Sequence, residues 1–188
     1  VDPAPSMLKR YQAMPANQYT EQEIADSLQI KIINLYSEAL SSVYKYFIKD
    51  EQENILHTYD GGFENISPYI TTLSYQDALS HCRPIVDYNF PINEDNWRTF
   101  SIIHTIKEGV GQDVLASNDT ISFIQKFENY FAYDDGSAEN GIGVEPIAGS
   151  HLAVAFDLNK SDTLTAVDIY FNSALNEANL KQFYLCVW

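Results

Sequence analysis

Hydrophobic and polar residues alternate with a period of two in several short segments, which is the pattern of half-buried strands. In the first part of the chain this alternation covers residues 28–32, 99–106 and 120–127, and a run dense in β-branched and aromatic residues covers 43–48. Short strands separated by turn-forming residues predict an all-β fold with a β-sandwich over residues 1–127.

Two stretches interrupt the alternation. Thr20 is followed three residues later by Glu23, a capping-box spacing that predicts one helical turn. Between residues 51 and 96, Asp60-Gly61-Gly62 and three X-Pro pairs act as breakers, so the pattern leaves room only for short strands there.

A second series of alternating segments covers residues 152–158, 167–171 and 183–187. These three strands predict a separate sandwich over 128–188, joined to the first by a short and stiff junction. Because the last of them reaches the final residue, we expect this second sandwich to be incomplete at its C-terminal end or to lean on the first. The chain begins with Val1, so we interpret it as a processed or excised piece whose export signal is already removed.

Composition and charge narrow the possible partners. The 188 residues are 45% hydrophobic and 20% charged, as in soluble globular proteins. Eleven Lys and Arg against 26 Asp and Glu give a net charge of −15, which disfavours nucleic acids and anionic membrane surfaces. No apolar run approaches the length of a membrane helix. We therefore expect neither a nucleic-acid partner nor membrane insertion.

Catalytic frames are missing from the sequence. None of the four histidines lies in H-E-x-x-H, no G-x-S-x-G occurs, and Gly141-Ile142-Gly143 lacks the third glycine of a dinucleotide fingerprint. His81 adjoins Cys82, but adjacent residues rarely face each other as nucleophile and base do. His104 shares a strand face with Ile102, which favours a core position. We predict no enzyme activity, no catalytic residue and no cofactor.

The two cysteines, Cys82 and Cys186, permit one disulfide at most. Cys82 lies in a polar stretch and Cys186 in an apolar strand pattern, so we expect both thiols to be free, with a single disulfide as the alternative.

An acidic turn and the tyrosines are the two features of the sequence that could bind a ligand. Asp134, Asp135 and Glu139 flank Gly136 and could supply oxygen ligands to a structural calcium, although Asp-Asp-Gly is also ordinary turn chemistry. Tyrosines could stack on sugar rings or pack within sheets, the packing interpretation being preferred. The tyrosines in question are Tyr36, Tyr44, Tyr46, Tyr69, Tyr75 and Tyr88.

The run over residues 127–139, FENYFAYDDGSAE, resembles a segment of large secreted proteins of Bacteroidota that end in a type IX secretion sorting domain. Residues 167–172 and 183–188 continue the resemblance, and Asn118-Asp119-Thr120 precedes it as in that family. The resemblance is good over residues 99–188. Over the earlier residues it is only general. This chain has Ser137 where the family pattern has Thr, and it has no sorting domain.

The resemblance implies an Ig-like or CARDB-like sandwich with Greek-key topology over 1–127, followed by a jelly-roll-like sandwich over 128–188. It also implies an extracellular or cell-surface location within a larger parent protein. Exported proteins of that lineage carry O-glycans at Asp-Ser or Asp-Thr followed by an apolar residue. Ser27, Thr120 and Thr163 match this pattern and are candidate glycosylation sites.

Three functions follow in order of preference. The first is a non-catalytic pair of β-sandwich modules of a secreted or cell-surface protein, acting as an adhesion, scaffold or spacer region beside other domains of the parent, with a surface protein or glycan as ligand. The second is carbohydrate binding by the jelly-roll half. The third is a small hydrolase whose side chains converge from distant loops.

Overall fold

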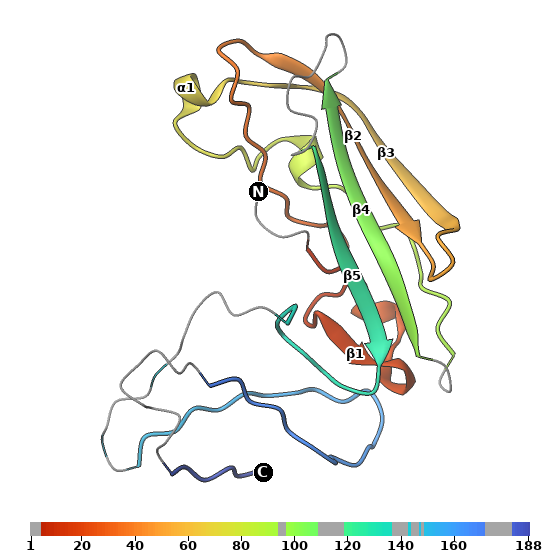
Figure 1. Ribbon diagram of the computed structural model, residues 1–188, viewed down its shortest axis with the longest axis vertical. Helices are drawn as coiled ribbons and strands as arrows, with labels where there is room; N and C mark the ends of the chain where they lie inside the picture. Colours follow the sequence, from red (N-terminus) through yellow and green to blue (C-terminus); the bar gives the residue numbers. More distant parts are fainter. Residues whose placement is uncertain are drawn as a thin grey trace. The chain divides into compact units, whose positions relative to one another are not determined.

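The computed structural model describes residues 5–93, 97–108, 119–136, 143, 147, 149–171 and 182–188 (Figure 1). The chain divides into two compact units, Val1–Asp135 and Gly136–Trp188. The division lies eight residues after the expected boundary at 127/128. The intervening segment belongs with the first unit because Ala132 pairs with Ala13, and because the ring of Tyr11 lies 4.8 Å from that of Phe131.

The first unit is built on one mixed five-stranded sheet, which confirms the all-β prediction (Figure 1). The strands are β1 Ala13–Pro15, β2 Leu40–Lys49, β3 Ile55–Ile66, β4 Arg98–Glu108 and β5 Thr120–Glu128. Their order in the sheet is β1-β5-β4-β2-β3. The short β1 is parallel to β5, whereas β2–β3, β2–β4 and β4–β5 are antiparallel. The predicted strands at 43–48, 99–106 and 120–127 are therefore confirmed as β2, β4 and β5.

The turn between β2 and β3 is closed by side-chain hydrogen bonds. The Asp50 carboxylate accepts bonds from the backbone N–H groups of Gln52 and Asn54, at 2.9 and 2.8 Å. Glu53 takes a left-handed conformation with φ 65°, which reverses the chain direction. The turn therefore forms from local polar chemistry that the surrounding hydrophobic pattern does not specify.

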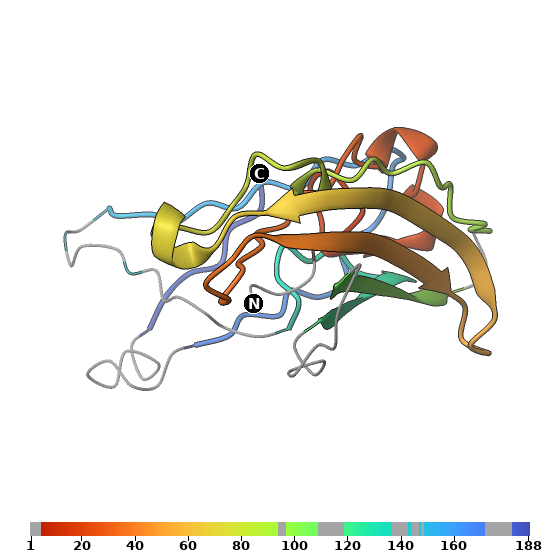
Figure 2. The ribbon, with the colours of Figure 1, turned by 90° about the horizontal axis from the view of Figure 1, so that it is seen from above.

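The expectation that residues 51–96 hold only short strands is wrong, because β3 is 12 residues long. The strand bends together with β2 along its length (Figure 2). Gly61 and Gly62 lie inside it, where the register with β2 shifts between Val43 and Lys45. A Cβ at Gly61 would come within 3.1 Å of the Tyr44 ring, and Gly62 has φ +69°. The two glycines thus form a β-bulge that bends the strand and does not end it.

The inward face of the sheet is covered by irregular chain that includes the short helices η1 Ala16–Gln18, η2 Glu21–Glu23 and η3 Ser80–Cys82, whereas α1 Tyr69–Thr72 has no buried residue. The helical turn expected after Thr20 is η2, although no side-chain capping bond forms. The predicted strand at 28–32 shows the expected alternating burial, but it makes only isolated bridges, Ser27 to Ile85 and Ile32 to Gln76. A second continuous sheet is not assigned in the described residues.

Alternate side chains of β2, β4 and β5 point into the core beneath this layer. Phe127 is fully buried, and its ring lies 4.9 Å from that of Tyr19 and 5.1 Å from that of Phe90. The other core residues from these three strands are Tyr44, Tyr46, Ile48, Phe100, Ile102 and Phe123. Burying such aromatic side chains is the main force that holds the layer to the sheet.

In the second unit, the expectation of three strands at 152–158, 167–171 and 183–187 is wrong. Its described residues belong to no helix or strand, and their side chains are exposed. One ring contact, 5.2 Å between Phe171 and Phe183, joins two of the segments. A strand needs a partner for its backbone N–H and C=O groups, and alternation alone supplies none. The arrangement of an Ig-like and a jelly-roll module is not confirmed.

Candidate functional site

The outward face of the sheet carries the side chains that alternate with the core residues. Strand register places them in rows across β3, β2 and β4, because residues paired in register project from the same face. The three rows are Phe63–Val43–Lys107, Asp60–Lys45–Thr105 and Thr58–Phe47–Ile103. We call this surface, with its continuation to Lys49 on β2 and to Ile124 and Lys126 on β5, the outward face.

A hollow of about 330 Å³ lies on the outward face. Its apolar lining comes from Val43, Phe47 and Phe63, and Lys45 and Lys107 border it. Phe63 is 73% exposed. The remaining lining residues are Thr105 and Glu108. The hollow therefore combines apolar surface with two lysines and one glutamate.

Charged side chains of both signs lie on the outward face. Register places four of the eleven Lys and Arg residues of the chain on it, together with Asp60 and Glu128, and Glu108 lines the hollow. The Nζ atom of Lys45 lies 2.6 Å from Asp60 Oδ2, and that of Lys49 lies 2.9 Å from Glu53 Oε2 in the adjacent turn. Within the described residues, Lys107 and Lys126 make no ion pair. Asp60, Glu53, Glu108 and Glu128 thus offset the four lysines, so the face carries no excess of positive charge.

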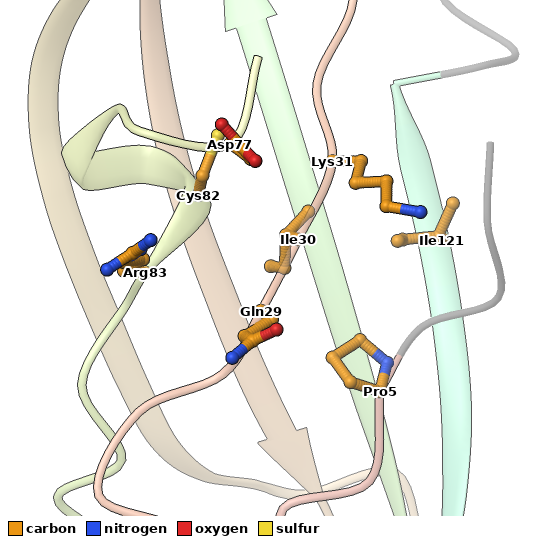
Figure 3. Close-up of a pocket in the computed structure, with 8 residues that line it drawn as sticks. All are labelled: Pro5, Gln29, Ile30, Lys31, Asp77, Cys82, Arg83 and Ile121. Atoms are coloured by element: carbon orange, nitrogen blue, oxygen red, sulfur yellow. The ribbon is translucent and has the colours of Figure 1, made fainter. Parts of the chain in front are cut away.

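A second hollow, of about 290 Å³, lies beside Cys82 (Figure 3). Burial raises the pKa of the Cys82 thiol, and its Sγ atom donates a hydrogen bond to the Gln76 carbonyl at 3.1 Å. A protonated thiol is a poor nucleophile. Lys31 extends toward Ile121 on the other side of the hollow (Figure 3). No cation is therefore directed at the sulfur from that side.

His81 does not form a pair with the neighbouring thiol. Its Nε2 atom lies 3.2 Å from the Ser42 carbonyl oxygen, and its ring packs against that of Tyr44 with centroids 5.7 Å apart. Both Cys82 and Cys186 are free in the structure, the first buried and the second exposed.

Three of the four histidines gather with tyrosines on the inward face, a cluster that the sequence did not single out. Tyr44 Oη and His104 Nδ1 are 2.7 Å apart, and the rings of Tyr46 and Tyr59 stack 4.9 Å apart. His104 is 2% exposed, which confirms its predicted core position, and its Nε2 atom has no hydrogen-bond partner. Burial lowers the pKa of His104 to about 4. The remaining histidines of the cluster are His57 and His81.

The expected calcium site lies only partly in the described residues. Asp134 and Asp135 are exposed and precede Gly136, whose φ of 95° suits the turn interpretation. Glu139 lies outside the described residues. Among the residues that the structure describes, no group of three His, Cys, Asp or Glu side chains could hold a metal ion. The calcium site stays a prediction.

The candidate glycosylation residues occupy three separate positions. Ser27 lies in the covering layer, Thr120 begins β5, and Thr163 follows Asp162, whose carboxylate accepts a bond from the Thr163 N–H at 2.8 Å. All three are exposed. Their modification stays a prediction.

The six tyrosines considered for sugar stacking divide into two groups. Tyr44 and Tyr46 are buried and Tyr88 packs against Phe90, with ring centroids 5.2 Å apart, as the packing interpretation expects. By contrast, Tyr36, Tyr69 and Tyr75 are 42%, 40% and 51% exposed. These three lie in and around α1 and not on the strands of the sheet.

Comparison of the chain with protein-family models, with curated proteins and with solved structures finds no match. In the described part of the chain, no helix is long and apolar enough to cross a membrane. The features of the described residues that bear on function are the outward face, the hollow beside Cys82 and the tyrosine–histidine cluster.

Proposed function

We propose that this chain is a non-catalytic β-sandwich region of a secreted or cell-surface protein, in which an Ig-like module is followed by a jelly-roll-like module. It acts as an adhesion or scaffold region beside other domains of its parent. Its ligand is a surface protein or a glycan.

The strand order supports the Ig-like part of this proposal. The β2–β3 and β4–β5 hairpins, joined through β2 and β4, give the order β5-β4-β2-β3. This is the G-F-C-C′ order of a variable-type immunoglobulin sheet, and the strands follow one another along the chain in the matching sequence. The covering layer, with its isolated bridges at Ser27 and Ile32, lies where the second sheet of such a sandwich belongs.

The exposed apolar side chains of the outward face are the main support for the adhesion role. A solvated sheet face normally presents polar side chains, as antiparallel alternation provides. Here Val43, Phe47 and Phe63 line a hollow, and Phe63 is largely exposed. Exposed apolar surface with a polar rim is typical of interaction sites.

Bead adhesion tests this function. Beads coated with the full chain are washed over surfaces that carry defined glycans or defined proteins, and retention is counted. We expect retention on at least one surface, lost with Phe63→Ser and kept with Ile70→Ser. Ile70 is a matched control because it is also 73% exposed but lies in α1. Retention no greater than that of beads coated with an unrelated acidic protein would contradict the proposal.

Carbohydrate binding is the second candidate, favoured by the exposed rings of Tyr36, Tyr69 and Tyr75 near α1. A ligand that binds only the folded chain raises its melting temperature. Thermal unfolding in the presence of soluble polysaccharides, with calcium or with EDTA, measures this effect. A rise with one polysaccharide that is lost in Tyr75→Ala would favour the glycan function.

A further inference from the structure

We propose that acid opens the part of the covering layer around η3 while the sheet stays folded, with His104 as the trigger and Cys82 as the group that opening uncovers. We call this part, residues 79–88, the η3 segment. The inference goes beyond the proposed function, because it assigns a pH-sensitive device to the inward face of the sheet. It requires a segment held less firmly than the sheet, and a buried group that takes up a proton when that segment opens.

The covering layer is held less firmly than the sheet. Continuous antiparallel pairing joins β2 to β4 and β4 to β5. The layer instead makes isolated bridges, Ser27 to Ile85 and Ile32 to Gln76. Local opening takes place where backbone pairing is sparse. We therefore expect the layer to open at a lower cost than unfolding of the sheet.

Side-chain hydrogen bonds fasten the η3 segment to the sheet. The Glu64 carboxylate on β3 accepts bonds from Ser80 N, Ser80 Oγ and His81 N, at 3.0, 2.8 and 2.9 Å. The Tyr46 hydroxyl on β2 donates to the Ile85 carbonyl at 3.0 Å. Such contacts can break one by one, because they do not belong to a strand ladder.

His104 is the buried group that responds to acid. Its side chain lies on the inward face of β4, its Nδ1 atom is 2.7 Å from Tyr44 Oη, and its Nε2 atom is buried without a hydrogen-bond partner. The Tyr44 ring also packs against His81 of the η3 segment, with centroids 5.7 Å apart. A proton on His104 would place a charge in the core, and opening would give that charge access to water. Protonation therefore favours the open state.

No neighbouring group compensates a proton on His104. The titratable groups that lie around it on β2, before β5 and in the covering layer are Tyr44, Tyr46, Asp119, Lys31 and His81. The structure records no ion pair for His104 within the described residues, and burial is the one cause that lowers its pKa. Lys31 is itself a cation and extends toward Ile121, the register partner of His104 on β5 (Figure 3).

Cys82 reports opening of the η3 segment. It is 1% exposed, its Sγ atom bonds to the Gln76 carbonyl, and its own carbonyl accepts a bond from Ile30 N at 2.9 Å. Cys186 is free and exposed. The chain thus carries one thiol that opening uncovers and a second whose reactivity provides the reference.

Thiol labelling of the full chain tests the inference. The reagent is 2,2′-dithiodipyridine, which reacts with thiols in acid as well as at neutral pH, and mass spectrometry gives the labelling rate of Cys82 relative to Cys186. We expect this ratio to rise about 20-fold from pH 7 to pH 5, because the pKa of His104 is about 4 when buried and 6.5 for an ordinary histidine. The far-UV circular dichroism should stay unchanged over the same range.

Variants separate the trigger from the fastening. His104→Gln and His104→Leu cannot titrate, so in both the ratio should change by less than about twofold with pH. His151→Gln, at an exposed position, should keep the full rise. Glu64→Ala removes the fastening and should raise the ratio already at pH 7, with a further rise at pH 5.

Three results would overturn the inference. The first is a ratio that rises by less than about twofold in the unchanged chain. The second is an equal rise in both His104 variants, which would assign the response to another group. The third is a rise that accompanies loss of the circular dichroism of the sheet, which would show unfolding of the whole unit.

Discussion

The inward and outward faces of the sheet are made by the same strands but have different chemistry. On β2, Tyr44 and Tyr46 point inward and are almost fully buried, whereas Lys45 and Phe47 between them are only partly buried. The inward face is covered by irregular chain, and the outward face carries a hollow. One alternating sequence thus supplies both a core and a candidate binding surface, and the covering layer decides which is which.

The two faces of the sheet also differ in their titratable groups. The inward face holds three histidines in contact with tyrosine rings, and burial raises the pKa of Tyr44 and lowers that of His104. The outward face holds lysines and apolar side chains. We therefore expect the inward groups to affect stability and the outward groups to affect association.

The largest expected effect is on the core side. Phe127→Ala removes a fully buried ring that packs against Tyr19 and Phe90, and should reduce the free energy of unfolding by about 3–5 kcal/mol. Ile124→Ala, three residues earlier on the same strand, is the control because Ile124 is 45% exposed on the outward face. Urea unfolding followed by circular dichroism measures both. Similar losses would break the distinction between the two faces.

Acidification should act through His104. Its pKa is about 4 in the folded chain and 6.5 for an ordinary histidine, so between these values the unfolded state binds a proton that the folded state does not. Stability contributed by the neutral ring is therefore full above pH 6.5 and falls as the pH drops toward 4, by about 3 kcal/mol in total.

Urea unfolding at several pH values checks this expectation. His104→Gln keeps a group that can bond to Tyr44 but cannot titrate, so its stability should fall less steeply than that of the unchanged chain between pH 6.5 and 4.5. His151→Gln, at an exposed position in the second unit, should leave the slope unchanged. An unchanged slope in His104→Gln would show that other groups dominate acid unfolding.

The smallest effect on stability is expected on the outward face. Phe63→Ser should change the free energy of unfolding by less than about 0.5 kcal/mol, because the ring is 73% exposed and loses few packing contacts. The same urea titration measures it. A loss above about 1.5 kcal/mol would mean that Phe63 is covered in the folded protein, and the outward face would then be part of a core.

The hydrophobic pattern predicted the strands of the sheet where alternation was strong. It failed where residues that usually end a strand have another role. Gly61 and Gly62 indicated the end of a strand, yet they bend β3 because a bulge is also a place for glycine. His104 was placed correctly in the core from its neighbours Ile102 and Ile106. Its contact with Tyr44 was not predictable, since 60 residues separate the two in the chain.

The candidate binding face was beyond sequence reasoning for a similar reason. Phe63, Val43 and Lys107 come from three strands and meet only through the register of β3, β2 and β4. Asp134, Asp135 and Glu139 could be predicted as calcium ligands from the sequence because they are neighbours in the chain, and that site stays a prediction. Local motifs are visible in a sequence, whereas sites assembled across strands are not.

The sequence by itself determined the strand class, the net charge of −15 and the alternation that gives each strand two faces. These properties depend on local backbone geometry and on composition. The tertiary structure alone decided that Tyr44 and His104 meet in the core and that Phe63 and Lys107 share the outward face. Strand order, register and the covering layer come from contacts between distant segments, and period-two alternation is equally compatible with either face being buried.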